Sequence, residues 1–323
     1  NKGEINYGVS STHYDKLDYD AISVASSKGD LAGDMKTDAE SKITFGISGT
    51  GRVYTGNVAG NISLYAYDGA TWNGAISGDD SNINLGFTGN SVWNITSDAK
   101  QHVNKLTSSD AASKRNFVNV GAGDITIDKY AGNTTFVFQH TAENPADLTG
   151  GNVTIKSAVP SDILSTGIGD GSEKEDVLGH AASTVYLQTA ADGINTEDSG
   201  LVNQVLDNLA KKLTYSAYVD GERNLSGRVE IAEGLTSSSV AKYYSNITFN
   251  EKTGQAQKEE KIFNPYVGVM FGDEKADSAA GYKDVISGTA AGKDLKYTFN
   301  DNAMVEVKLN SMPKGVWGNT LYC

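Results

Sequence analysis

The feature that most limits the fold of this chain is an internal repeat of 21 residues. The segment Asn61-Ile-Ser-Leu returns as Asn82-Ile-Asn-Leu, and each copy is followed 11 residues later by a Trp-Asn pair that begins at Trp72 or Trp93. Two matches at the same offset indicate a repeated structural unit and not a coincidence of composition. Such a period is typical of a chain that coils so that each turn stacks on the previous one.

Apolar residues extend this spacing in both directions. Around them, short segments alternate apolar and polar positions and are broken by Gly, Asn or Asp. Alternation with period two makes strands with one apolar side, and strands this short cannot close a core alone. If successive turns stack, their inward side chains form columns. The predicted columns are Ile43, Leu64, Leu85, Leu106 and Ile127 in one ladder, and Trp72 over Trp93 in another.

The sequence therefore predicts an all-β fold, namely a right-handed parallel β-helix with about 20 residues and three short strands per coil. The backbone groups of each coil would pair with the next coil, so that only the two ends of the stack need covering. An antiparallel sandwich of short strands is the alternative. A sandwich gives no reason, however, for a tryptophan to recur in register with an Asn-Ile pair.

The pattern divides the chain into five regions. Residues 1–40 are expected to form opening coils or a cap, and residues 41–160 the regular stack. An acidic, glycine-containing loop with irregular coils is expected over 161–198. A helix is expected over 199–213, and C-terminal coils with a cap over 214–323.

The region 199–213 changes to a helical pattern. Its apolar residues recur at steps of three and four, which places them on one face of an amphipathic helix. Asp198 or Ser199 precedes this face as a cap, and Lys211 and Lys212 fall in the predicted last turn, where they suit the helix dipole. We expect the helix to cover an exposed edge or a break of the stack, with partner binding as the alternative.

Composition and charge exclude several classes of partner. The 323 residues include 36 glycines, 4 prolines and 21% charged residues, which fits a β protein dense in turns. The formal net charge of −13 argues against nucleic acid and against an anionic membrane surface. The one cysteine, Cys323, permits no disulfide within the chain, and no run of 18 apolar residues exists to span a membrane as a helix. Because no initiator methionine or apolar leader begins the chain, we expect a processed or excised segment.

Residues with catalytic or metal-binding chemistry are sparse. The four histidines, His13, His102, His140 and His180, form no i, i+4 pair and no pair with a cysteine, so no zinc or iron site is expected. The acidic clusters lie in glycine- or serine-rich loops, which is typical of solvated loops rather than of paired catalytic carboxylates. These clusters are Asp79-Asp80, Glu173–Asp176 and Asp273-Glu274 with Asp277. We expect no enzyme activity and no cofactor; a polysaccharide-cleaving enzyme and weak calcium binding in these loops are the alternatives.

Asparagines and tyrosines are the other frequent polar residues. Asn-x-Ser/Thr sequences occur at Asn61, Asn94, Asn133, Asn152, Asn224 and Asn246. We interpret them as asparagines stacked along the turns of the coil, rather than as glycosylation sites. The 16 tyrosines, among them Tyr65 and Tyr67, are expected to pack on the coil surface, with stacking on sugars or proteins as the alternative.

Several of these segments resemble a known family, the passenger domains of bacterial autotransporters (type V secretion). They are also similar to the large repetitive surface proteins of diderm Firmicutes such as Veillonella relatives. The likeness covers residues 40–255. The segments that carry it are Ala70-Thr-Trp-Asn-Gly-Ala-Ile, Asn90-Ser-Val-Trp-Asn-Ile-Thr, Val103-Asn-Lys-Leu, the block from Leu201 to Tyr215, Val229-Glu-Ile-Ala-Glu-Gly-Leu-Thr and Ile247-Thr-Phe.

The resemblance implies a right-handed β-helix that is exported across an outer membrane to the bacterial cell surface or released. It implies a non-enzymatic adhesin whose partner is a host-cell or bacterial surface protein or glycan, or another copy of itself in a biofilm. Membrane attachment would need a barrel domain that this chain does not contain. A structural stalk without binding activity is the alternative. The Gly-Asp-Ser-Gly motif of the protease members is missing, so their activity does not carry over.

Overall fold

The structure is a computed structural model that forms two compact units, Asn1–Glu259 and Glu260–Cys323. It describes residues 5–8, 21–26, 30–38, 41–78, 81–108, 115–159, 183–222, 225–236, 239–259, 286–287 and 296–297. The boundary between the units lies inside the region 214–323, for which the sequence predicts one set of coils with a cap. In the second unit, the described residues are the short antiparallel strands β21 (Ile286–Ser287) and β22 (Lys296–Tyr297).

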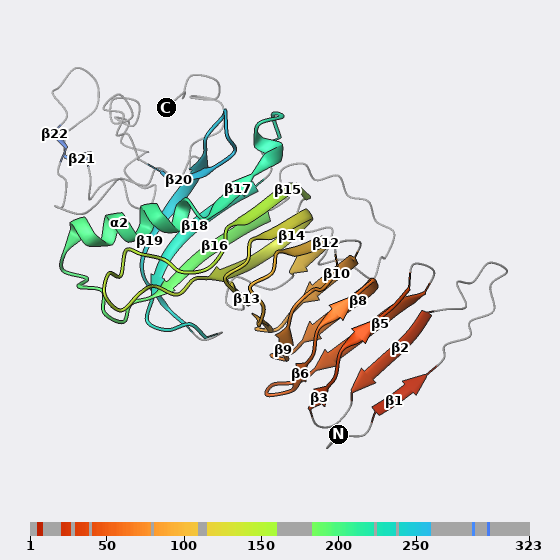
Figure 1. Cartoon of the computed structure of the whole chain (residues 1–323). Helices are drawn as coiled ribbons and strands as arrows, with labels where there is room; N and C mark the ends of the chain where they lie inside the picture. Colours follow the sequence, from red (N-terminus) through yellow and green to blue (C-terminus); the bar gives the residue numbers. More distant parts are fainter. Residues whose placement is uncertain are drawn as a thin grey trace. The chain divides into compact units, whose positions relative to one another are not determined.

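Most strands of the first unit pair in parallel and form two ladders within one curved sheet (Figure 1). Each strand pairs with the strand that holds the same place one turn of the chain later. The first ladder consists of β2 (Ala21–Ser26), β5 (Lys42–Ser48), β8 (Asn61–Tyr67), β10 (Asn82–Phe87), β12 (Gln101–Ser108), β14 (Ile125–Val137), β15 (Val153–Val159) and β17 (Leu213–Tyr215).

The second ladder alternates with the first along the chain. It consists of β3 (Leu31–Ala32), β6 (Val53–Thr55), β9 (Thr71–Gly74), β11 (Val92–Ile95), β13 (Asn116–Asn119), β14, β16 (Ser183–Ala190) and β18 (Leu225–Ala232). Strand β14 belongs to both ladders because its 13 residues continue from one to the other. A third, short parallel pair joins β4 (Met35–Lys36) and β7 (Val58–Ala59).

The fold is therefore all-β, with a large parallel sheet and the helix α2 (Ser199–Ala210). Parallel pairing from β2 to β18 rules out the antiparallel sandwich for this unit. Within the region 161–198, for which the sequence predicts an acidic loop and irregular coils, β16 (Ser183–Ala190) is a strand of the second ladder. Residues 160–182, which include the acidic loop, lie outside the described residues.

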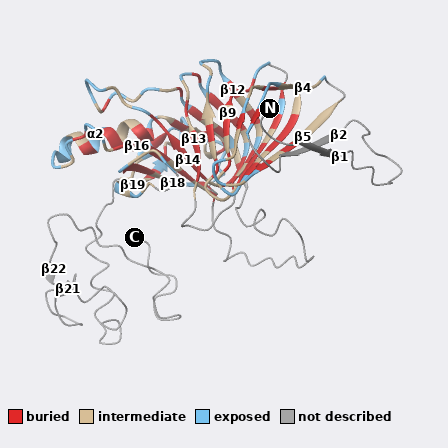
Figure 2. Cartoon of the chain, turned by 90° about the horizontal axis from the view of Figure 1, so that it is seen from below, coloured by how far each residue is buried: buried red, intermediate tan, exposed pale blue. Residues whose placement is uncertain are grey.

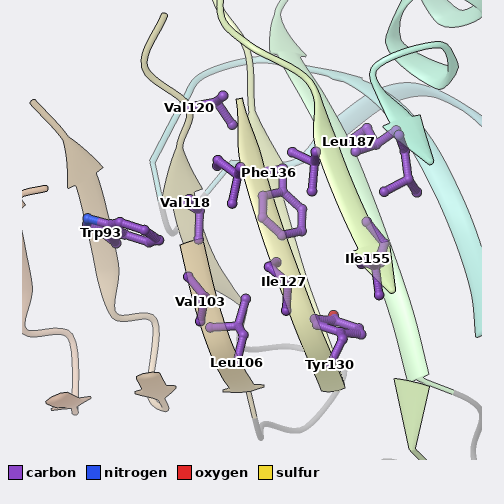
Figure 3. Close-up of a cluster of buried hydrophobic side chains, with 14 of the residues drawn as sticks. Trp93, Val103, Leu106, Val118, Val120, Ile127, Tyr130, Phe136, Ile155 and Leu187 are labelled. Atoms are coloured by element: carbon purple, nitrogen blue, oxygen red, sulfur yellow. The ribbon is translucent and has the colours of Figure 1, made fainter. Parts of the chain in front are cut away.

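The core of the first unit lies on the inward side of both ladders (Figure 2). Alternation of the strands sends every second side chain to this side, where the large apolar residues are fully buried. The close-up in Figure 3 shows side chains of both ladders in one cluster, among them Leu106, Ile127, Ile155, Val118, Phe136 and Leu187.

The chain reverses direction at the C-terminal end of the first unit. Strand β18 pairs antiparallel with β19 (Ala241–Phe249), and β19 pairs antiparallel with β20 (Ala256–Lys258). At the other end, β1 (Ile5–Gly8) is antiparallel to β2. An antiparallel strand therefore pairs with the first strand of the first ladder and another with the last strand of the second ladder.

Helix α2 packs against β16, β18, β19 and β20. It buries one apolar face, made of Val202, Val205, Leu206, Leu209 and Ala210. Asp198 caps it by accepting a hydrogen bond from the Leu201 backbone N–H at 3.1 Å. The helix ends at Ala210 and not at residue 213, because Leu213 already begins β17; Lys211 is the C-cap and no basic residue lies in the last turn.

Candidate functional site

Trp72 and Trp93 are stacked inside the second ladder. They are register partners, their ring centroids are 4.7 Å apart, and the ring planes differ by 7°. Each indole N–H donates to a backbone carbonyl one turn earlier in the chain, Trp72 to Gly56 at 2.9 Å and Trp93 to Gly74 at 3.0 Å. Both side chains are buried, so these residues hold successive turns together and form no contact surface.

The leucine column is present but shorter than the spacing predicts. Leu64, Leu85 and Leu106 are successive register partners. Ile43 and Ile127 do not belong to this column: the first lies opposite Ile62, 19 positions later, and the second lies opposite Val103, 24 positions earlier. The loops in these turns differ in length from those of the 21-residue repeat. The register continues the column instead through Phe45 to Val24 at one end and through Tyr130 to Ala158 at the other.

Asparagines are stacked on the outward side of the ladders. In the second ladder, the Asn94 side-chain amide donates to Asn73 at 2.7 Å, and the Asn119 amide donates to Asn94. In the first ladder, Asn104 donates to Asn84 at 2.8 Å. Each of these hydrogen bonds joins side-chain amides on successive strands of a ladder.

A surface carrying two tyrosines lies on the outward side of β5, β8 and β10, and we call it the tyrosine face. Its positions alternate with the buried Phe45, Leu64 and Leu85, and therefore point away from the core. The tyrosine face consists of Thr44, Gly46 and Ser48 on β5, Ser63, Tyr65 and Tyr67 on β8, and Asn84 and Gly86 on β10.

The two tyrosine rings are parallel. Their centroids are 6.0 Å apart, their planes differ by 4°, and Tyr67 is 36% exposed. A Cβ atom on Gly86 would lie 2.5 Å from Cδ1 of Tyr65, so the Tyr65 ring lies against the glycine backbone. A Cβ on Gly46 would meet only Cε2 of Tyr67, at 3.8 Å. Burial raises the pKa of the Tyr67 hydroxyl, and Tyr65 adds to this rise, so the phenol is neutral at physiological pH.

A buried ion cluster lies on the outward side of the second ladder. Both terminal nitrogens of Arg115 donate to Glu230, and the Arg228 guanidinium lies 3.7 Å from the same carboxylate. Arg115 also lies over the ring of Tyr186 at 4.1 Å, and Arg228 over the ring of Tyr244 at 4.2 Å. The side chain of Glu230 has no exposed surface, so its charge is compensated within the protein.

Asp128 forms a second, more exposed ion group on the first ladder. Lys156 lies 2.7 Å and His102 Nε2 lies 2.9 Å from its carboxylate oxygens. Burial would raise the pKa of Asp128, but the hydrogen bonds and charges of Lys156 and His102 outweigh it and hold that pKa below its usual value. Asp128 is therefore ionised and paired at neutral pH.

The other predicted chemical residues are not brought together. His140 contacts the backbone carbonyl of Thr141, while His13, His180 and the three acidic clusters lie outside the described residues. Within the described ranges, no three His, Cys, Asp or Glu side chains gather as a metal site. No helix there is long and apolar enough to cross a membrane.

A hollow of about 620 Å³ lies beside Asn57, the residue before β7, and beside the segments that follow β9 and β11. It is lined by Asn57, Ala75, Ile76, Ser77, Gly78, Thr96, Ser97, Ala99 and Lys100. Lys100 is the one titratable residue of this lining. The hollow thus has hydroxyl groups and one lysine but no histidine or carboxylate in its lining, and the tyrosine face is the better candidate for contact with a partner.

Comparison of the chain with protein-family models, with curated proteins and with solved structures gave no match.

Proposed function

We propose that the first unit is a right-handed parallel β-helix and that the chain is a surface adhesin segment of the autotransporter type. The coil is supported by the alternation of the ladders. Between one strand and its partner in the first ladder, the chain visits the second ladder, as β9 does between β8 and β10. A parallel connection that returns to the same sheet is right-handed in about 98% of cases.

The single observation that favours adhesion is the tyrosine face. It is an outward surface on regular strands, and it presents two parallel aromatic rings. Aromatic side chains on a rigid scaffold are typical of contact surfaces, because they bury a large area at a small cost in conformational entropy. In this proposal the segment is displayed on the bacterial surface or released, and it attaches to host cells, to other bacteria or to copies of itself.

Deletion of the gene tests this function. We expect the deletion strain to aggregate less and to attach less to host cells, and re-expression of the gene to restore both. Purified protein added in excess should block attachment of the wild-type strain. Unchanged aggregation and attachment after deletion would contradict the proposal, as would release of products from an acidic polysaccharide by the purified protein.

A structural stalk is the second candidate. The antiparallel strands β19 and β20 and helix α2 at the end of the parallel stack favour it, because they cover an end of the core. A stalk predicts that deletion weakens attachment whereas purified protein binds to no cell and blocks nothing. The blocking experiment therefore separates the two candidates.

A further inference from the structure

We propose that three lysines on the outward side of the first ladder bind a linear polysaccharide that carries carboxylate groups. These residues are Lys105 on β12, Lys129 on β14 and Lys156 on β15, and we call them the lysine row. The inference rests on the proposed adhesive function and names the chemical class of a ligand.

The lysine row crosses three neighbouring strands on one side of the sheet. Lys105 and Lys129 are register partners, and Lys156 precedes Ser157, the partner of Lys129. Neighbouring strands lie about 4.8 Å apart, so one extended ligand chain can reach all three ammonium groups. All three side chains are exposed, and each lysine stands next to a buried residue of the inward side, namely Leu106, Tyr130 and Ile155.

The strands of the first ladder differ in the sign of their charge from the chain as a whole. The chain carries a formal net charge of −13 with histidine neutral. At physiological ionic strength, charges in water are screened beyond about 8 Å, so nearby lysines and not the distant net charge set the field at this place. The charged residues of these strands are four lysines and one aspartate, namely Lys42, Lys105, Lys129, Lys156 and Asp128.

The protein does not compensate the two central lysines. Asp128 is already paired with Lys156 at 2.7 Å and with His102 at 2.9 Å. Among the described residues, Lys105 and Lys129 pair with no carboxylate. Like charges side by side on neighbouring strands are destabilising. A carboxylate that bridges these two ammonium groups would remove the repulsion, which favours an anionic ligand.

Uncharged hydrogen-bonding groups continue the row on both sides. Asn84 is the register partner of Lys105, and its Oδ1 accepts from Asn104, which leaves its amide Nδ2 as a donor. Ser157, the partner of Lys129, donates its hydroxyl hydrogen to a backbone carbonyl at 2.8 Å, so its oxygen can still accept. Amide and hydroxyl groups beside ammonium groups match a sugar that carries both hydroxyls and a carboxylate. A nucleic acid fits less well, because its binding depends on neutralising many phosphates.

Binding of the full chain to immobilised polygalacturonate tests the inference. The fully methyl-esterified polymer is the matched neutral probe, and single-stranded oligothymidylate is the phosphate-bearing probe. We expect tighter binding to polygalacturonate than to either, and weaker binding when sodium chloride is added. Lys105→Gln/Lys129→Gln should weaken binding by about tenfold, the equivalent of about 1.4 kcal/mol. Its unfolding midpoint should not fall, because the substitution removes a repulsion.

Lys242→Gln/Lys252→Gln is the matched control, since both lysines are exposed, lie outside the first ladder and give the same change in net charge. Equal loss of binding in the two double variants would overturn the inference. Equal binding of the esterified polymer, tighter binding of oligothymidylate, or failure of the wild-type protein to bind polygalacturonate would do so too. A protein that binds no polygalacturonate but still blocks cell attachment would refute the acidic ligand and leave the adhesive function standing.

Discussion

Arg115 donates two hydrogen bonds to Glu230, a carboxylate that lies 115 positions later in the chain and has no exposed surface. The pair joins the residue before β13 to β18, so it spans the strands β14 and β16 that lie between them in the second ladder. Replacing both members of such a buried pair by apolar residues changes the free energy of unfolding little. Removing only one member lowers it strongly, because the other charge stays buried without its partner.

Arg115→Ala should therefore reduce the free energy of unfolding by about 3 kcal/mol, because it leaves the Glu230 carboxylate buried with Arg228 alone. The double variant Arg115→Met/Glu230→Met should lose less of the free energy of unfolding than Arg115→Ala does. Urea unfolding measures both. Lys156→Ala is the control, since its pair with Asp128 is more exposed and should change the free energy by about 1 kcal/mol or less. Equal losses in Arg115→Ala and Lys156→Ala would contradict the buried role of the first pair.

Gly74→Ala should disrupt the tryptophan stack. Its Cβ would lie 1.9 Å from the Gly56 carbonyl oxygen and 2.5 Å from the Trp72 indole nitrogen. We expect a loss of about 3 kcal/mol or more and a change in the near-ultraviolet circular dichroism of the indoles.

Gly51→Ala is the matched glycine control for this clash. Gly51 has a φ of +77° with open space around the added Cβ, so the substitution should cost only backbone strain, about 1 kcal/mol. If Gly74→Ala lowered the free energy of unfolding no more than Gly51→Ala does, this would contradict the close contact of Gly74 with Gly56 and Trp72.

The phenol of Tyr215 should make the first unit sensitive to alkali. Burial, with the charge of Glu222, raises the pKa of Tyr215 to about 12. Because the folded pKa lies above the unfolded value, the contribution of the neutral phenol is fully present below about pH 10 and is lost as the pH rises through 12. Tyr215→Phe should flatten the stability curve over this window, as measured by urea unfolding at stepped pH. An unchanged slope in the variant would argue against it.

Leu209→Ala tests the role of α2 in covering the end of the core. Leu209 is fully buried, and its truncation should reduce the free energy of unfolding by about 3 kcal/mol. The exposed Gln204 of the same helix is the control, and Gln204→Ala should change it by about 0.5 kcal/mol or less. A helix that serves only as a partner-binding element would give small effects at both positions.

The sequence predicts the parts of the fold that repeat. The 21-residue spacing predicts the pairs Trp72 with Trp93 and Leu64 with Leu85, because loops of equal length bring equal positions into register. It fails at Ile43, where a turn of different length shifts the partner to Ile62. Periodicity alone contains no information on loop length outside the exact copies.

The candidate site is only partly visible in the sequence. Tyr65 and Tyr67 stand out by their period of two, and Gly86 follows Tyr65 after one 21-residue repeat. The contact between Gly86 and the Tyr65 ring depends on how the strands pack, which the sequence pattern does not show. The pair of Arg115 and Glu230 has no local signal at all, because neither residue belongs to a repeat and their contact depends on the count of intervening rungs.

Strand β14 has a mechanical consequence for the first unit. Hydrogen bonds between parallel strands lie across the strands, so tension applied to the two ends of the stack separates rungs one after another, as in a zipper. At β14 the same strand bonds to β12 and β13 on one side and to β15 and β16 on the other. Both ladders must open there at once, so we expect the resistance to unravelling to be greatest at this strand.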